Sequence, residues 1–479
     1  MSLSSLVTAT TLAVSAVTPI SPPLLPDLGN DGYQVVAYDL SYDFTPSTSL
    51  LPGTARITAV ADRRLPEFRL DFAGGSVAKV QVDGRPAAFH LDKEKLVVDP
   101  ATAIRGPFSV TVDFTADRAA KIPSTVDPTA GWLNAPDGGF AWTGQPDRAH
   151  LFFPCNDAVD DKAYFRYHVT VPKGWTVAAN GPLVAQNATN STTTFTYTPA
   201  HPFAPQLAQL AVGKYTTVTG TGPNGLPLRS FVPDAAAAKP MLDQLPGFVD
   251  WLQQRIGRRF PFETVGLLGA DHMTQQSDAL ETQTLPVFRA GALADPKNDS
   301  TVVHELAHQW FGDSAAVADW RDLWLSEGFA TYFDRLYAAE HGGKPVADEL
   351  RWAYETFDPT VRSLGFTPAN PTRPDVMFAI ARGAGAVVVY ALQQKVGDQT
   401  FHRIIDTYLD RYRDGNATSA DFIRVATAVG GPELGPFLHD WLYGTKTPPM
   451  PGHPDWTVTP AGATARTLTA PQELPFHRR

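Results

Sequence analysis

The sequence has a single cysteine, Cys155, among 479 residues, so neither an intrachain disulfide nor a cluster of cysteine metal ligands can form. No run approaches the roughly eighteen uncharged apolar residues that a membrane-spanning helix needs. Basic residues are also few, since 39 Lys and Arg stand against 49 Asp and Glu, and the formal net charge is −10. Because binding of nucleic acid needs a basic surface, we expect neither a nucleic-acid partner nor a membrane span.

Internal repeats and low-complexity segments are absent as well. The 42 prolines and 37 glycines are spread along the chain, which predicts many turns rather than a collagen-like protein. A hydrophobic content of 43% excludes a disordered chain, and the length suggests roughly two to four folded units.

The two ends of the chain differ in composition from the rest. Residues 1–30 are a proline-rich leader in which the apolar stretch 6–17 resembles part of a secretion signal. No Lys or Arg precedes that stretch, so both a cytoplasmic and a secreted location stay open. Residues 448–479 are again proline-rich and are predicted to form an irregular tail.

Between these ends the periodicity of apolar side chains changes once. Within residues 31–220 apolar and polar side chains alternate, as at 108–114, which indicates half-buried strands. The Asp83-Gly84 pair indicates a hairpin turn. Within residues 221–447 apolar side chains recur every three or four positions, as from Met241 to Ile256, where Pro246 is expected to kink or break the helix. The fold class predicted is therefore α+β with several domains: an antiparallel β-sandwich-like domain followed by a mostly helical one.

One pentapeptide in the helical part carries clear chemistry. His304-Glu305-Leu306-Ala307-His308 places two imidazoles four residues apart, on one face of a helix, where both can reach the same ion. Glu305 lies one position round the helix and can face a water on that ion. By composition alone such a pattern is expected only about 0.01 times in a chain of this kind. The pentapeptide therefore predicts a zinc site with Glu305 as its base.

A third ligand is available further along the chain. Glu327 follows His308 after a gap of eighteen residues, enough for one helix to end and a second to begin. We expect Ser326 or a neighbour to cap that second helix, and Glu327 to approach the metal from it. His304, His308 and Glu327 are thus the predicted ligands of one zinc ion per chain, with a fourth position left for water.

The pentapeptide, the gap and the segment 324–330 resemble the aminopeptidase N family of zinc metallopeptidases, the gluzincins, in a short form without their large C-terminal helical domain. The resemblance implies a thermolysin-like fold for the catalytic domain. Segment 278–282 is similar to the family's Gly-x-Met-Glu-Asn motif, which implies that Glu281 binds the free α-amine of a substrate. Gly144-Gln145 and the Phe-Pro-Cys segment at 153–155 are also similar to the family's, which implies that Gln145 assists Glu281.

One position departs from the family. The family has a tyrosine two residues before a Lys/Arg-Gly-Ala triplet, and it stabilises the oxyanion; here the triplet is Arg382-Gly383-Ala384 and the aligned residue is Ile380. Loss of one such hydrogen-bond donor typically costs about 10²–10³ in turnover. Either another donor replaces the tyrosine, or the protein is slow.

Three functional hypotheses follow. The first is a zinc aminopeptidase that hydrolyses the N-terminal bond of peptides with a free N-terminus. The second is a zinc-binding pseudo-peptidase that binds peptides or partners without cleaving them; Ile380 supports it, whereas the retained Glu305 argues against it. The third is an endopeptidase with the same zinc site, against which Glu281 argues because a fixed carboxylate favours an ammonium at one end of the substrate.

Overall fold

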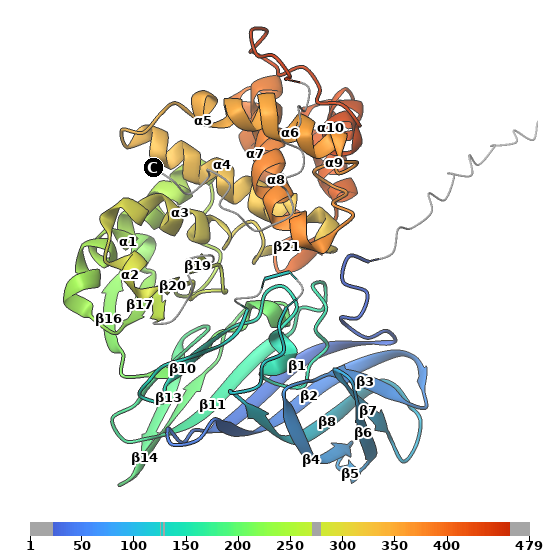
Figure 1. The fold of residues 1–479 in the computed structure, drawn as a ribbon, viewed down its shortest axis with the longest axis vertical. Coiled ribbons are helices and arrows are strands. Elements are labelled where there is room, and N and C mark those ends of the chain that lie inside the picture. Colours follow the sequence, from blue (N-terminus) through green and yellow to red (C-terminus); the bar gives the residue numbers. More distant parts are fainter. Residues whose placement is uncertain (1–22, 125, 128–129, 271–278, 460–479) are drawn as a thin grey trace, which may run out of the picture.

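The structure is a computed structural model that describes residues 23–124, 126–127, 130–270 and 279–459. Figure 1 shows β-strands in its lower part and most of the helices in its upper part. This is the α+β fold predicted from the sequence, an N-terminal β part followed by a helical part. The signal-like stretch 6–17 and Asp278 lie outside the described residues.

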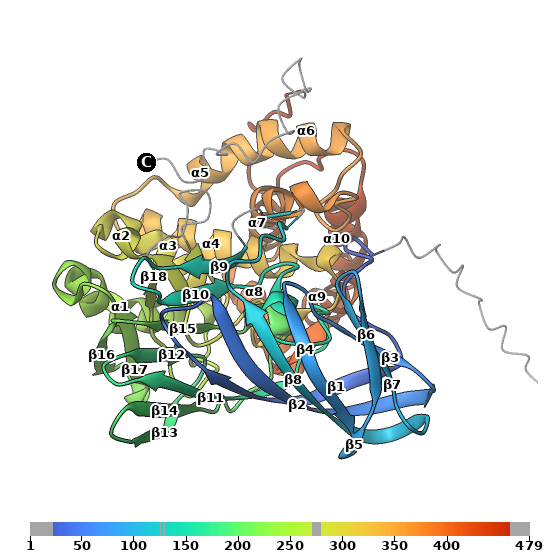
Figure 2. The ribbon, with the colours of Figure 1, turned by 60° about the horizontal axis from the view of Figure 1, so that its bottom comes forward.

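The N-terminal part is built on an eight-stranded sheet in the order β13-β14-β11-β1-β2-β8-β4-β5. Its strands pair antiparallel except for β1 and β11, which run parallel. The long strands curve across the lower part of the molecule in Figure 2. The strands of this sheet are β1 (Tyr33–Asp43), β2 (Leu50–Leu65), β4 (Gly75–Val82), β5 (Arg85–Pro86), β8 (Ile104–Asp117), β11 (Tyr164–Pro172), β13 (Leu183–Ala188) and β14 (Thr192–Tyr197).

Two smaller sheets complete the β part, one in the order β3-β7-β6 and one in the order β12-β15-β10-β9. Their strands are β3 (Phe68–Asp71), β6 (Ala88–Asp92), β7 (Lys95–Asp99), β9 (Gly131–Asn134), β10 (Phe140–Thr143), β12 (Thr176–Ala179) and β15 (Leu210–Gly213). The predicted alternation at 108–114 lies in β8, and its apolar side chains are buried. The predicted hairpin is also confirmed: Asp83 and Gly84, both with positive φ, connect β4 to β5.

The segment that carries Gln145 is held in the core of the β part. Trp142, just before it, stacks on Phe152 with ring centroids 4.5 Å apart. Between them, His150 in the short 3-10 helix η1 (Ala149–Leu151) has its Nδ1 atom 2.7 Å from Asp157 and its Nε2 atom 3.1 Å from Glu94. These contacts hold the chain in place both before and after Gln145. The packed core of the β part therefore positions the loop that carries Gln145.

A five-stranded sheet in the order β16-β17-β18-β20-β19 begins the second part. The boundary predicted between residues 220 and 221 lies at the end of β16, and because β16 pairs with β17 in this sheet, we propose that the boundary lies just before β16. Helix α1 (Ala235–Ile256) contacts this sheet and starts at Asp234, whose side chain accepts hydrogen bonds from two backbone amides of the first turn. Of the kink or break expected at Pro246, the break is wrong, because one helix runs through this residue. The strands are β16 (Thr216–Thr221), β17 (Pro227–Val232), β18 (Leu268–Ala270), β19 (Ala279–Leu280) and β20 (Val287–Arg289).

The helices that follow pack around α4 and α7. Glycines allow this pair to approach closely, because a Cβ added to Gly328 of α4 would lie 2.8 Å from the backbone of Gly385 in α7. A capping box between Thr418 and Asp421 begins α9. The helices are α2 (Ala290–Leu293), α3 (Asp299–Ala307), α4 (Trp324–Glu340), α5 (Val346–Trp352), α6 (Asp358–Ser363), α7 (Met377–Val396), α8 (Asp398–Arg411), α9 (Ser419–Gly430) and α10 (Leu434–Tyr443), and β21 (Ala315–Val317) pairs with β22 (Gly415–Ala417).

Helix α7 with the turn before it, Pro374–Val396, is long and apolar enough to cross a membrane by length and composition. However, 78% of its most apolar window is buried inside the protein. A core helix gives the same pattern, and α7 packs against α4, α8 and α10.

Candidate active site

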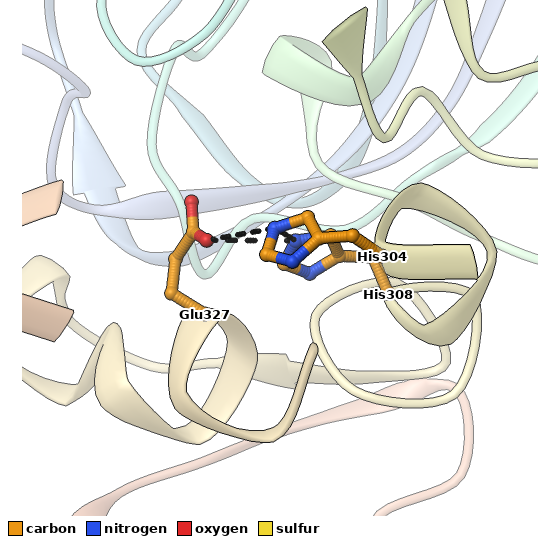
Figure 3. Close-up of side chains that lie close together, drawn as sticks. All are labelled: His304, His308 and Glu327. Carbon is orange, nitrogen blue, oxygen red and sulfur yellow. Dashed lines mark hydrogen bonds and ion pairs between the residues drawn. The ribbon is translucent and has the colours of Figure 1, made fainter. Parts of the chain in front are cut away.

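Two neighbouring helices bring the three predicted metal ligands together. His304 lies in the last turn of α3, His308 caps the end of that helix, and Glu327 lies in the first turn of α4. Figure 3 shows the three side chains pointing toward one another. Their exposed fractions are 6%, 1% and 0%, so the cluster is shielded from water.

The ligand atoms converge on one point. The Nε2 atoms of His304 and His308 are 3.2 Å apart, and they lie 3.2 and 3.7 Å from the Oε2 atom of Glu327. Two imidazole nitrogens and one carboxylate oxygen form the donor set of a catalytic zinc site. The arrangement can therefore hold a metal ion.

The other ring nitrogens determine which tautomers are present. His304 Nδ1 lies 2.9 Å from the Asp334 carboxylate, and His308 Nδ1 lies 3.1 Å from the carbonyl oxygen of Phe311. Because both neighbours are acceptors, each Nδ1 donates a proton to its neighbour, and Nε2 is the ring nitrogen whose lone pair a metal would take in place of a proton. Both lone pairs thus face the point where the ligand atoms meet, as a metal requires.

The charges of the cluster favour a cation at this point. Burial alone would lower the pKa of His304, but hydrogen bonds to Asp334 and Glu327 raise it above its ordinary value. Burial would likewise raise the pKa of Glu327, yet Arg382 and the imidazoles hold it well below its ordinary range. Glu327 is therefore ionised, and the donor set carries the negative charge that binds a divalent ion.

Glu305 faces the same space from α3. Burial raises the pKa of Glu305 to about 7. Its carboxylate, the carboxylate of Glu281 and the imidazole of His308 form a second group of side chains whose ligand atoms lie close together. Glu281 accepts a hydrogen bond of 2.5 Å from the Nε2 atom of Gln145, which comes from the β part. The backbone carbonyl of Glu281 is held by Gln309, one residue after His308. The structure thus brings every predicted site residue together, with Gln145 contributed by the β part and the others by the helical part.

Comparison with known proteins identifies the arrangement. Residues 241–441 match the model of the peptidase family M1 domain. Residues 241–441 are therefore a peptidase family M1 domain. It is 25% identical over 428 residues to a probable aminopeptidase of Sulfurisphaera tokodaii, covering 85% of this chain and 53% of the relative. It is 24% identical over 454 residues to a leucyl aminopeptidase of Saccharolobus solfataricus, covering 90% and 55%. The chain thus spans about half the length of these relatives.

A solved M1 structure matches over almost its whole length. The chain is 27% identical to a mutant of the M1 zinc metallopeptidase of Deinococcus radiodurans bound to a Tyr-Ser-Ala substrate, with a TM-score of 0.76. The match covers 90% of this chain and 98% of that protein. The two-part architecture of this M1 protein is therefore shared with a solved zinc metallopeptidase.

The structure corrects one expectation for this site and shows where the residue aligned with the family tyrosine lies. Ser326 does not cap α4, since it lies inside the first turn, where its hydroxyl donates to the Phe311 carbonyl and contacts His308 Nδ1. Ile380 does not face the ligand cluster: it is 2% exposed and packs in a small apolar core with residues of α6 and its neighbours. It lies two residues from Arg382 on α7, about 200° round the helix, so the two side chains face opposite ways.

Three residues of the site escaped the sequence analysis as participants. Asp334 lies seven residues after Glu327 on α4, a spacing of about two turns that places both on one face. That spacing was a usable signal. Ser326 and Arg382 carry no such signal, because no periodicity reveals which residue of another helix will meet Glu327.

Ile380→Tyr should lower stability without raising turnover. The larger ring must enter a filled core, which typically costs about 1–3 kcal/mol. Its hydroxyl would also be buried away from the metal ligands. We expect a lower melting temperature and an unchanged kcat in the fraction that folds. A stable variant with a tenfold higher kcat would instead mean that position 380 reaches the substrate.

Proposed function

We propose that this M1 protein is a zinc-dependent aminopeptidase that hydrolyses the N-terminal bond of peptides. The observation that carries the proposal is the convergence of His304 Nε2, His308 Nε2 and Glu327 Oε2, with tautomers set by their partners, next to the Gln145–Glu281 pair. The family membership and the peptide substrate bound in the Deinococcus radiodurans structure support it.

His304, His308 and Glu327 would hold one zinc ion, and the fit of their donor atoms and tautomers supports this assignment. When bound there, zinc would supply a Lewis acid for the scissile carbonyl and increase the acidity of a water. Asp334 and the Phe311 carbonyl would keep the two imidazoles oriented, as hydrogen-bond partners of metal-binding histidines do.

Glu305 would move the proton. Glu305 is 4% exposed, and its raised pKa of about 7 brings it near the value at which a group accepts and returns a proton readily. It would take a proton from the attacking water and deliver it to the amine that leaves. A residue that only helped to bind peptides would not need this basicity.

Glu281 and Gln145 would hold the substrate's N-terminus. The Glu281 side chain is buried, and it is bonded to a neutral amide rather than to a cation, so its charge is available to an ammonium group. A carboxylate oxygen of Glu281 lies within 4.8 Å of a ring nitrogen of His308, a proposed zinc ligand. A carboxylate fixed so close to the zinc limits how many substrate residues can precede the scissile bond. Removal of one residue at a time follows from that limit.

Two substrates and a chelator test the proposal. The purified protein should release 4-nitroaniline from an aminoacyl 4-nitroanilide and should not act on the N-acetylated form. Dialysis against a chelator should abolish the activity, and about one equivalent of zinc should restore it. Cleavage of the acetylated substrate at a similar rate would indicate an endopeptidase. Full zinc occupancy with no turnover would indicate the pseudo-peptidase.

Glu281→Gln should weaken recognition of the free amine. The substitution keeps the size of the side chain but replaces a charge-assisted hydrogen bond, worth about 1.5–3 kcal/mol, with a neutral one. We expect kcat/KM for aminoacyl substrates to fall about 10- to 100-fold, mostly through KM. Steady-state kinetics with measured zinc content provide the check. An unchanged kcat/KM would show that the amine binds elsewhere.

A further inference from the structure

Hydrolysis at this site needs a donor for the carbonyl oxygen as negative charge develops on it, and Ile380 cannot be that donor. We propose that Arg382 donates the hydrogen bond to the carbonyl oxygen of the scissile bond. This inference rests on the proposed aminopeptidase function and adds a catalytic residue to it. Three observations support it: the position at which Arg382 is held, the N–H groups that it does not use in bonds to Glu327, and the carboxylates around it.

Arg382 is anchored beside the metal ligands. Its Nε and Nη2 atoms donate to the two carboxylate oxygens of Glu327 at 2.8 and 3.1 Å. The close approach of α4 and α7 at Gly328 and Gly385 brings the two side chains together. A guanidinium held by both ends of a carboxylate has a fixed orientation, so little further ordering is needed during the reaction.

The guanidinium also keeps donors for a substrate. It carries more N–H groups than its two bonds to Glu327 use. The Arg382 side chain is 34% exposed, whereas that of Glu327 is 0% exposed. The Nη1 group takes no part in the bonds to Glu327, so its N–H groups are the donors that remain for a substrate.

The position of Arg382 fits a group that opposes negative charge. Its charge acts on Glu327, Glu305 and Glu281, the carboxylates assigned to the metal, the proton transfer and the substrate's amine. A cation paired with Glu327, and close enough to the other two carboxylates for their charges to raise its pKa, lies near the bond on which they would act. Arginine stays charged at any working pH, so it can donate to a developing oxyanion throughout the cycle.

A competing role is that Arg382 only positions Glu327. In that case its removal would weaken metal binding, and excess metal would restore the activity. A donor to the oxyanion behaves differently, because its interaction strengthens in the transition state while the metal and the ground state are little affected. Zinc content and the binding of inhibitors separate the two roles.

The test compares Arg382→Gln and Arg382→Lys with the wild type. Arg351→Gln is the matched control, since Arg351 also forms an ion pair with a carboxylate, Glu355, away from the site. For each protein we would measure zinc content, melting temperature, kcat and KM. We would also measure binding of a phosphinic dipeptide analogue, whose anionic tetrahedral phosphorus mimics the transition state, and of free L-leucine.

For Arg382→Gln we expect a full equivalent of zinc and a kcat lowered about 100-fold with little change in KM. Binding of the phosphinic analogue should weaken by a similar factor, while L-leucine binds as before, and Arg382→Lys should recover part of both losses. An unchanged affinity for the phosphinic analogue would overturn the proposal. So would loss of zinc whose replenishment restores full activity. A wild type without turnover would refute the aminopeptidase function, and the analogue would still decide the role of Arg382.

Discussion

His308→Ala should remove the bound zinc and all measurable peptidase activity. The substitution takes away one of the three proposed ligands, whose Nε2 atom lies 3.2 Å from that of His304 and 3.7 Å from Glu327 Oε2. It also leaves the Phe311 carbonyl and the Ser326 hydroxyl without the ring nitrogen that they contact. We expect less than a tenth of an equivalent of zinc after dialysis, by metal analysis, and a rate near background.

The same variant has a thermal signature. A ligand that binds only the folded state stabilises it by about 4 kcal/mol when its concentration is about 1,000 times Kd. A chelator should therefore lower the melting temperature of the wild type but leave that of His308→Ala unchanged. His341→Ala is the matched control, because His341 stacks on Tyr337 at the other end of α4. Retention of a full equivalent of zinc in His308→Ala would refute its assignment as a ligand.

The division of the fold into a β part and a helical part could be predicted from periodicity. The alternation of apolar residues in β8 and their three- and four-residue spacing in α1 both arise because one face of the element is buried. Such spacing can be seen in the sequence alone. The break expected at Pro246 failed for a local reason. Tertiary packing of Met241, Leu245 and Leu252 against the core holds α1 together across a residue that removes one backbone hydrogen bond.

The grouping of the three proposed zinc ligands could also be predicted, because one helical turn relates His304 to His308 and the gap before Glu327 leaves room for a second helix. Contacts between distant elements could not. Arg382 meets Glu327 only because α7 packs closely on α4, and Ile380 faces a core formed by other segments. Alignment of a short motif gives the residue at a position but not the face of the helix on which it lies.

Glu305→Gln should keep the zinc and lose the turnover. The amide has the size and shape of the carboxylate but cannot accept a proton from water at any useful pH. Loss of a general base typically costs about 10²–10⁴ in rate, and Glu305 serves twice, as base and then as acid. We expect kcat near the upper end of that loss, with a full equivalent of zinc and little change in KM.

The comparison is clear because the substitution leaves the metal ligands in place. Glu305 is adjacent to His304 on α3, so a collapse of the helix would appear as loss of zinc, which metal analysis detects. Glu340→Gln, which replaces a surface partner of Arg255, is the matched control and should hydrolyse substrate at the wild-type rate. A Glu305→Gln rate within about threefold of the wild type would place the general base elsewhere. A large loss of kcat with zinc retained would show that Glu305 transfers the proton and is not needed to bind the metal. The variant would then bind zinc and the peptide without hydrolysing the peptide.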